Sequence, residues 1–180
     1  MSSCKNPKSR FETAGPIPPE NEGKVADLAP YGTIVNTNLN FGGISLTNSG
    51  SSGAFVAKYS SSGATQWALQ AGGTNFGDYF DVALDGQSNV YPAGSLSSDA
   101  AVAKYNPAGM LQWTYSAGGP PATPVASIVA KCAVDSAGNC YLAGWYQGTA
   151  TFGTNVMQPK GAWNFSCVAQ FVGNRGVDFM

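Results

Sequence analysis

The 180-residue sequence contains no histidine. This absence removes Ser-His-Asp and Cys-His nucleophilic arrangements, histidine general bases and most catalytic zinc sites. Charged residues are scarce too: they make up 11% of the chain, whereas an ordinary soluble domain carries about 25%. The net charge of −1 gives no electrostatic attraction to nucleic acid or an anionic membrane. No apolar run approaches the roughly 20 residues of a membrane span. We therefore expect a protein that is not an enzyme, holds no cofactor, binds no nucleic acid and has no membrane span.

The residues that are abundant indicate an all-β fold. The chain is 43% hydrophobic and 12% aromatic, and it contains 23 glycines. After the first thirty residues, no stretch of ten or more shows the 3.6-residue apolar period and the caps of a helix. Short apolar segments instead recur at the 8–12-residue spacing that is typical of β-strands joined by turns.

One sequence element occurs twice, 46 positions apart, at residues 54–73 and 100–119. Periods of 20–50 residues are typical of solenoids, propellers and other repeat arrays. The chain therefore consists of copies of one unit. The recurring residues that define the element include Val56, Lys58, Tyr59, Gly63, Trp67 and Gly72, which return as Val102, Lys104, Tyr105, Gly109, Trp113 and Gly118.

A second element alternates with the first, at residues 82–94 and 132–144. Degraded matches also link Phe41-Gly42 to Phe152-Gly153, and the segment 55–59 to 167–171. These offsets predict units at approximately residues 31–76, 77–122 and 123–180. The unit length varies mainly in one connection, which is short at residues 95–99 and long at residues 145–164.

Each element reads as a β-hairpin. Apolar strands flank turns at residues 60–63 and 106–109 in the first element, and at 86–89 and 136–139 in the second. Gly, Asn, Ser and Pro in these segments suit tight turns. Two hairpins in tandem predict a four-stranded antiparallel sheet for each unit.

The pattern F-G-G…A-F-V-A-K-Y-x-x-x-G-x-x-x-W-x-x-x-x-G-G, followed by V-A-L-D-x-x-x-N-V-Y-x-A-G, resembles the bacterial β-propeller repeat known as the SBBP repeat. The resemblance covers roughly residues 39–171. It implies propeller blades in a large secreted or surface protein of bacteria. Pro92, Cys132, Cys140 and Gln170 depart from the pattern. The Tyr-x-x-x-Gly-x-x-x-Trp spacing also resembles, more distantly, the tryptophan-docking motif of quinoprotein-like propellers.

Residues 31–180 are too few for a closed ring, because propellers have at least four blades. They suffice for about two and a half to three, so we expect an incomplete arc: a fragment of a larger propeller, or a subunit that closes a ring with other copies. Open blade ends would expose apolar faces and favour self-association, for example of two arcs into a ring of about six blades. A compact sandwich of stacked sheets is the alternative fold.

The first thirty residues differ from the rest in composition, with five prolines and eight charged residues. We expect residues 1–30 to form a disordered tail or linker. The segment lacks the apolar core of a signal peptide. Met1-Ser-Ser-Cys4 resembles the end of a bacterial lipoprotein signal, in which the cysteine is lipidated. An extracellular or cell-surface location is therefore expected, with Cys4 as a candidate anchor.

The recurring polar residues fit structural roles. Asp85 and Asp135 occupy equivalent positions, as do Asn89 and Asn139. Their oxygen atoms could bind calcium, but Asp and Asn also stabilise their own turns by hydrogen bonds. Because the residues recur, we favour the turn role and expect no metal. The recurring lysines are expected to pack their stems along a neighbouring strand.

Four aromatic residues flank the long connection and have no counterpart in the short one. Beside a polar loop, such residues could form a platform for a carbohydrate or a peptide of a protein ligand; otherwise they cover an exposed blade face. These candidate ligand-binding residues are Trp145, Tyr146, Trp163 and Phe165.

Cys132 and Cys140 flank one turn and are predicted to lie on nearly the same face of their hairpin. A cross-strand disulfide would suit an oxidising compartment. Their repeat counterparts, Val82 and Val90, instead favour two small apolar core residues. A zinc site that includes Cys167 lacks the necessary C-x-x-C spacing.

The sequence therefore predicts a non-enzymatic scaffold or binding module made of propeller-type repeats. The alternative is a fragment of a carbohydrate-binding or quinoprotein-like propeller enzyme. An enzyme should carry a cluster of unrepeated polar residues at one end of the ring, whereas the polar residues seen here recur.

Overall fold

The computed structural model describes residues 31–35, 38–47, 52–71, 77–97, 99–117, 127–146, 149–152, 155–157, 167–171 and 177–179. The predicted tail at residues 1–30, Cys4, Trp163 and Phe165 lie outside these ranges. All regular structure in the described ranges is β-strand, so the predicted all-β fold class is confirmed. The described residues contain no helix that could cross a membrane.

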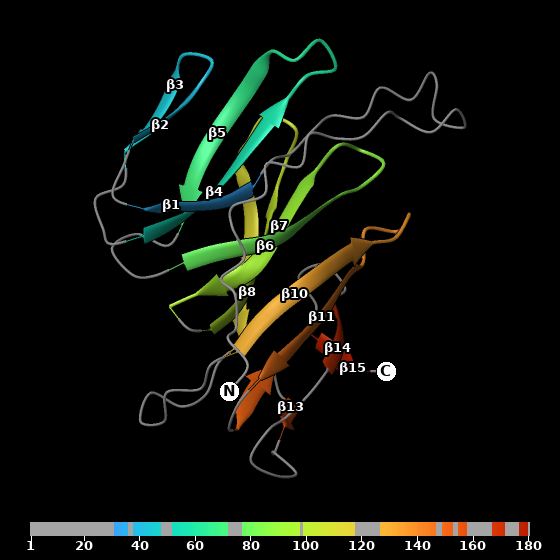
Figure 1. The fold of residues 1–180 in the computed structure, drawn as a ribbon. Helices are drawn as coiled ribbons and strands as arrows, with labels where there is room; N and C mark the ends of the chain where they lie inside the picture. The colour runs from blue at the N-terminus through green and yellow to red at the C-terminus, as the bar shows by residue number, and fades with distance from the viewer. Residues whose placement is uncertain are drawn as a thin grey trace, which may run out of the picture.

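Eleven of the described strands form three larger antiparallel sheets, which follow one another in chain order (Figure 1), and the other four form two two-stranded hairpins. The first sheet contains β1 (Tyr31–Val35), β4 (Ser52–Tyr59) and β5 (Thr65–Ala71). The second contains β6 (Gly77–Leu84), β7 (Val90–Leu96), β8 (Asp99–Tyr105) and β9 (Leu111–Ala117). The third contains β10 (Ser127–Val134), β11 (Cys140–Tyr146), β14 (Cys167–Phe171) and β15 (Val177–Phe179).

Equivalent strands carry the same irregularities. The β4–β5 pair shifts register between Lys58 and Tyr59, and the β8–β9 pair shifts at the equivalent Lys104 and Tyr105. The pairs β6–β7 and β10–β11 both shift near the start, leaving Phe80 and Ala130 as the extra residues. Bulges bend and twist a strand locally. The sequence repeat is therefore a structural repeat down to these local distortions.

Pro92 lies inside β7 and is fully buried. Proline has no backbone N–H and cannot donate to a sheet ladder. Accordingly, the β7–β8 pairing runs from Val90↔Tyr105 directly to Ala93↔Val102. In the third sheet Leu142 stands at this position, and the β11–β14 pairing there is continuous.

Two further hairpins are inserted at the same place in two units. The hairpin β2–β3 (Asn38–Phe41 and Ile44–Thr47) connects β1 to β4, and β12–β13 (Ala150–Phe152 and Asn155–Met157) lies between β11 and β14. The second sheet makes this connection through residues 97–98 alone. The sequence suggested that residues 145–164 form one long loop. In the structure, β11 continues to Tyr146 and the β12–β13 hairpin follows it.

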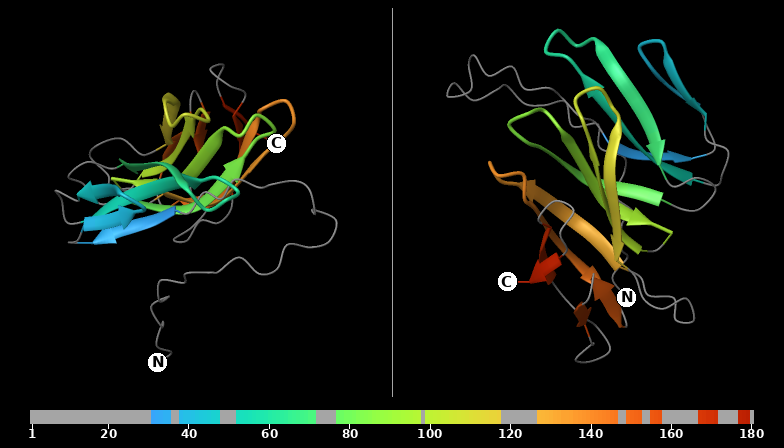
Figure 2. Two further views of the ribbon diagram at one scale, coloured as in Figure 1. Left: turned by 90° about the horizontal axis from the view of Figure 1, so that it is seen from above. Right: turned by 180° about the vertical axis from the view of Figure 1, so that it is seen from behind.

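The sheets lie in successive layers (Figure 2), and apolar clusters fill the spaces between these layers. One joins the first and second sheets, and its buried members are Ala54, Val56, Trp67, Tyr79, Val90, Ala103 and Tyr105. Another joins the second sheet to the third sheet and the β12–β13 hairpin. Its buried members are Tyr91, Ala93, Ala100, Val102, Cys140, Leu142, Tyr146, Ala150 and Phe152. The third cluster lies between the first sheet and β2–β3, with Phe41, Ala57 and Ala68 buried.

Candidate functional site

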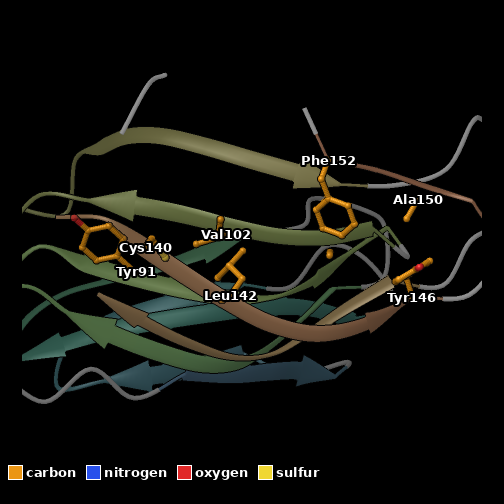
Figure 3. Packing of buried hydrophobic residues seen from close by; sticks show 9 residues of the cluster. Tyr91, Val102, Cys140, Leu142, Tyr146, Ala150 and Phe152 are labelled. Atoms are coloured by element: carbon orange, nitrogen blue, oxygen red, sulfur yellow. The ribbon is translucent and has the colours of Figure 1, made fainter. Parts of the chain in front are cut away.

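The two described members of the predicted aromatic platform lie at the end of β11, where Trp145 pairs with Ile128 and Tyr146 pairs with Ser127. Adjacent residues on a strand point to opposite faces. Trp145 is 41% exposed, whereas Tyr146 is only 7% exposed and belongs to the core between the second and third sheets. Figure 3 shows Tyr146, Ala150 and Phe152 gathered at one end of this cluster. Tyr146 therefore presents no ring to a ligand, which corrects its assignment to the platform.

The described part of the candidate site thus reduces to the indole of Trp145. An exposed indole offers a large flat apolar face and one N–H donor, which suits stacking against a sugar ring or a peptide. Nearby in the chain, the β12–β13 hairpin exposes Val156, at 58%. The hairpin also buries Phe152 in the core, at 3% exposure. At this end of the third sheet, the buried Phe152 therefore anchors the hairpin to the core, and Trp145 and Val156 are exposed to solvent.

The recurring aspartates act as turn residues, as expected. Asp85 Oδ1 accepts hydrogen bonds from the backbone N–H groups of Gln87 (3.0 Å) and Asn89 (2.9 Å). Asp85 Oδ2 accepts from Asn89 Nδ2 at 2.7 Å and from the Tyr91 hydroxyl at 2.9 Å. Burial raises the pKa of Asp85, but these bonds outweigh that effect and leave the pKa below its usual value.

Asp135 repeats this arrangement. Its Oδ1 accepts from the N–H groups of Ala137 and Asn139, both at 2.9 Å. Its Oδ2 accepts from Asn139 Nδ2 at 2.7 Å and from the Tyr141 hydroxyl at 3.0 Å. The bonds from Asn139 are the main reason that the pKa of Asp135 is lowered. Within the described ranges, no group of three or more His, Cys, Asp or Glu residues could hold a metal ion.

The recurring lysines differ in their partners. Lys58 is 2% exposed, and its Nζ donates to the Ser88 carbonyl oxygen of the second sheet at 3.2 Å. Nζ of Lys104 lies 3.8 Å from Asp85 Oδ2 and 5.1 Å from the centroid of the Tyr91 ring. Both ammonium groups therefore stabilise the same turn of the second sheet, at residues 85–89: that of Lys58 through a carbonyl oxygen, and that of Lys104 through a carboxylate and the face of an aromatic ring.

The tryptophan of the first sheet joins two sheets. Trp67 is 8% exposed, and its Nε1 donates to the Pro107 carbonyl oxygen in the β8–β9 turn at 3.0 Å. The ring centroids of Trp67 and Tyr105 are 6.1 Å apart. The recurring aromatic residue Trp67 thus packs between two sheets.

Two polar links between sheets were not anticipated from the sequence. The Thr33 hydroxyl of β1 donates to Asp78 of β6. Asp81 of β6 accepts from the backbone N–H of Cys132 at 2.9 Å and pairs with Lys131 Nζ at 3.5 Å. Asp81 and Lys131 occupy equivalent repeat positions with opposite charge, and this complementarity was the available signal.

The proposed disulfide is not formed. Cys132 pairs with Leu142 across the β10–β11 ladder, and Cys140 pairs with Val134, so the cysteines are diagonal neighbours. Diagonal neighbours are typically about 7–8 Å apart, with a somewhat shorter distance between their Cβ atoms, whereas a disulfide needs a Cβ–Cβ distance of about 3.5–4.5 Å. Both residues are free thiols, with Cys132 half-buried and Cys140 buried. Burial raises the pKa of both thiols, that of Cys140 to about 12.

No protein-family model matches the chain, and no significant relative is found among curated proteins. The resemblance to the β-propeller repeat therefore depends on the recurring residues themselves. What the structure adds is the equivalence of the sheets and of their turns.

Proposed function

We propose that the chain is a non-enzymatic scaffold or binding module built from β-propeller-type repeats, serving a bacterial secreted or cell-surface protein. Three equivalent sheets packed face to face in chain order support this proposal, because successive blades of a propeller pack in this manner. The first sheet lacks a strand equivalent to β6 among the described residues, which supports an incomplete arc of about two and a half to three blades.

The main observation in support of a non-enzymatic role is that the polar side chains of the described residues make structural contacts. Asp85 and Asp135 hold turns, Lys58 and Lys104 both bind the turn of Asp85, and Asp81 joins two sheets. Each is occupied by structural hydrogen bonds or ion pairs. Within the described ranges these groups therefore serve the fold, which supports a non-enzymatic role.

We assign ligand binding to the surface around Trp145, with a carbohydrate or a protein segment as the ligand. The full chain should be tested against a panel of soluble polysaccharides by isothermal titration calorimetry. Trp145→Ala should weaken binding at least tenfold. The matched control is Phe80→Ala, because Phe80 is exposed to a similar degree, 38% against 41%, and lies on a different sheet. Equal losses in both variants, or none, would argue against this site.

A second candidate is a fragment of a carbohydrate-binding or quinoprotein-like propeller enzyme. It is favoured by the Trp67–Pro107 hydrogen bond, since the spacing around Trp67 resembles the tryptophan-docking motif. A redox-dye assay with sugars and alcohols, with and without added quinone cofactor, separates the two candidates. Turnover that depends on added quinone would favour the enzyme.

Self-association through the ends of the stack is part of the proposal, because a sheet that lacks a neighbour exposes an apolar face. Light scattering after size exclusion at micromolar concentration measures it directly. A species of two chains or more supports association, whereas a strict monomer contradicts it. Export and anchoring through Cys4 are tested by cell fractionation of the native host.

A further inference from the structure

The hairpin β2–β3 occupies the place of a preceding sheet. In the second sheet, Ala103 and Tyr105 are packed by Val56 and Trp67 of the first sheet. Their counterparts in the first sheet, 46 positions earlier, are Ala57 and Tyr59. These residues pack with apolar side chains of β2–β3 instead: Leu39, Phe41, Ile44 and Leu46. Ala57 is completely buried as a result, and the rings of Phe41 and Phe55 are 5.2 Å apart. The bare sheet face that the sequence suggested at this end is therefore covered.

The two faces of the hairpin differ in polarity. Cross-strand partners Leu39↔Leu46 and Phe41↔Ile44 form its apolar face. The opposite face consists of exposed, uncharged polar residues: Asn38, Asn40, Ser45 and Thr47. Asn40 Nδ2 donates to Ser45 Oγ at 2.9 Å on that face, and the N–H of Gly43 donates to Asn40 Oδ1 at 3.0 Å. A terminal unit of a repeat array needs such a polar outer face to stay soluble.

The equivalent hairpin inside the stack does not share this pattern. In β12–β13, Thr151 pairs with Val156, as Asn40 pairs with Ser45 in β2–β3. The interior hairpin therefore presents an apolar valine where the first hairpin presents a serine. Phe152, the counterpart of Phe41, lies in the cluster between the second and third sheets. Two hairpins at equivalent places in the repeat thus differ in the polarity of the face that each presents.

We infer that β2–β3 is an end cap, which closes the first face of the stack against a second copy of the chain. The cap replaces the apolar surface of a missing sheet and exposes polar atoms instead. This inference rests on the repeat architecture of the proposed function and restricts the self-association proposed there. A closed ring of two arcs needs both ends of each arc, so the cap excludes it.

The first test weakens the cap in the full chain. Leu39→Ser with Leu46→Ser removes apolar contacts with the first sheet, whereas the control, Asn38→Ser with Thr47→Ser, leaves the apolar face intact and keeps the exposed face polar. At micromolar concentration, light scattering should show at least a twofold higher average mass for the leucine variant, with increased binding of a hydrophobic dye. The control should match the unmodified chain. A folded leucine variant with unchanged mass would overturn the inference.

The second test locks the cap and stays informative if the leucine variant fails to fold. A Cβ atom built on Gly42 would lie 3.7 Å from the Thr65 Cβ, close to the roughly 3.8 Å of a disulfide. Gly42→Cys with Thr65→Cys, in a Cys4→Ser, Cys167→Ser background, therefore staples the hairpin to β5. A permanent cap predicts the same average mass for the oxidised and reduced protein. If copies associate by displacing the hairpin, oxidation should dissociate the oligomer, which would overturn the inference.

Discussion

The indole nitrogen of Trp67 donates to the carbonyl oxygen of Pro107, 40 positions further along the chain and in the next sheet. The same ring lies against Gly109, so closely that a Cβ atom there would be 2.9 Å from it. The turn that ends with Gly109 thus contacts the indole ring of Trp67 from the preceding sheet, through a hydrogen bond and through van der Waals packing. Coupling between sheets depends on this contact as well as on the apolar cluster beneath it.

Gly109→Ala should destabilise the protein more than Gly63→Ala. Both glycines adopt positive φ, +80° and +81°, which costs a non-glycine residue about 1–2 kcal/mol. Only at Gly109 would the new methyl group also clash with Trp67, since nothing lies within 4 Å of a Cβ on Gly63. We expect Gly109→Ala to lower the free energy of unfolding by at least about 1 kcal/mol more than Gly63→Ala. Urea unfolding followed by tryptophan fluorescence measures the difference. Equal losses would mean that the contact with Trp67 is unimportant.

A second pair of variants exchanges the residues of equivalent turns. Ser88 has φ +62°, whereas its counterpart Gly138 has φ +84°. The left-handed conformation is unfavourable for serine and easy for glycine. Ser88→Gly should therefore raise the free energy of unfolding by about 1 kcal/mol, and Gly138→Ser should lower it by a similar amount. The Ser88 carbonyl, which accepts from Lys58, is retained in the variant. Thermal unfolding of both variants checks the opposite signs.

The sequence repeat predicted the hairpins well, because their turns carry local signals. Asp85, Asn89 and Gly138 are residues whose side chain or backbone freedom fixes a turn without help from distant parts of the chain. Strand ends were less accurate: β11 continues to Tyr146, beyond the predicted end at Gly144. Pairing with β10 extends that strand, and such pairing is a tertiary effect.

The β2–β3 hairpin was missed although its signal is present. Asn38–Phe41 and Ile44–Thr47 alternate polar and apolar residues around Gly42-Gly43, a pattern typical of a two-residue hairpin. The burial of Tyr146, by contrast, could not be predicted from the sequence. Trp145 and Tyr146 are both aromatic, and only the register with β10 decides which of them faces the core. A one-residue slip would exchange them.

The two described thiols should be unreactive in the native protein. Burial raises the pKa of Cys132 and Cys140, and only the thiolate attacks an alkylating reagent. At pH 8 we expect iodoacetamide to label both at least 100-fold more slowly than in urea, as measured by mass spectrometry of the two peptides. Failure to label them in urea without reductant would reveal a disulfide.

Cys132→Val, which introduces the residue found at the equivalent repeat position, Val82, should leave the free energy of unfolding nearly unchanged.

The turn aspartates should make the protein less stable in acid. The pKa of Asp85 is lowered in the folded state, because the hydrogen bonds from Asn89, Tyr91 and Gln87 outweigh the effect of burial. Its stabilising contribution is therefore complete above the unfolded pKa of about 3.9, and is lost as the pH falls through the folded value. Asp85→Asn should accordingly lose stability at pH 7, with a smaller difference from the unmodified chain at pH 2.5.

Asp99→Asn is the control of opposite sign, since burial raises the pKa of Asp99. Its charge destabilises the folded state at neutral pH, so that variant should gain stability at pH 7 and less at pH 2.5. Urea unfolding at the two pH values measures both differences, and a pH-independent loss in Asp85→Asn would show that the turn does not depend on the charge of the carboxylate.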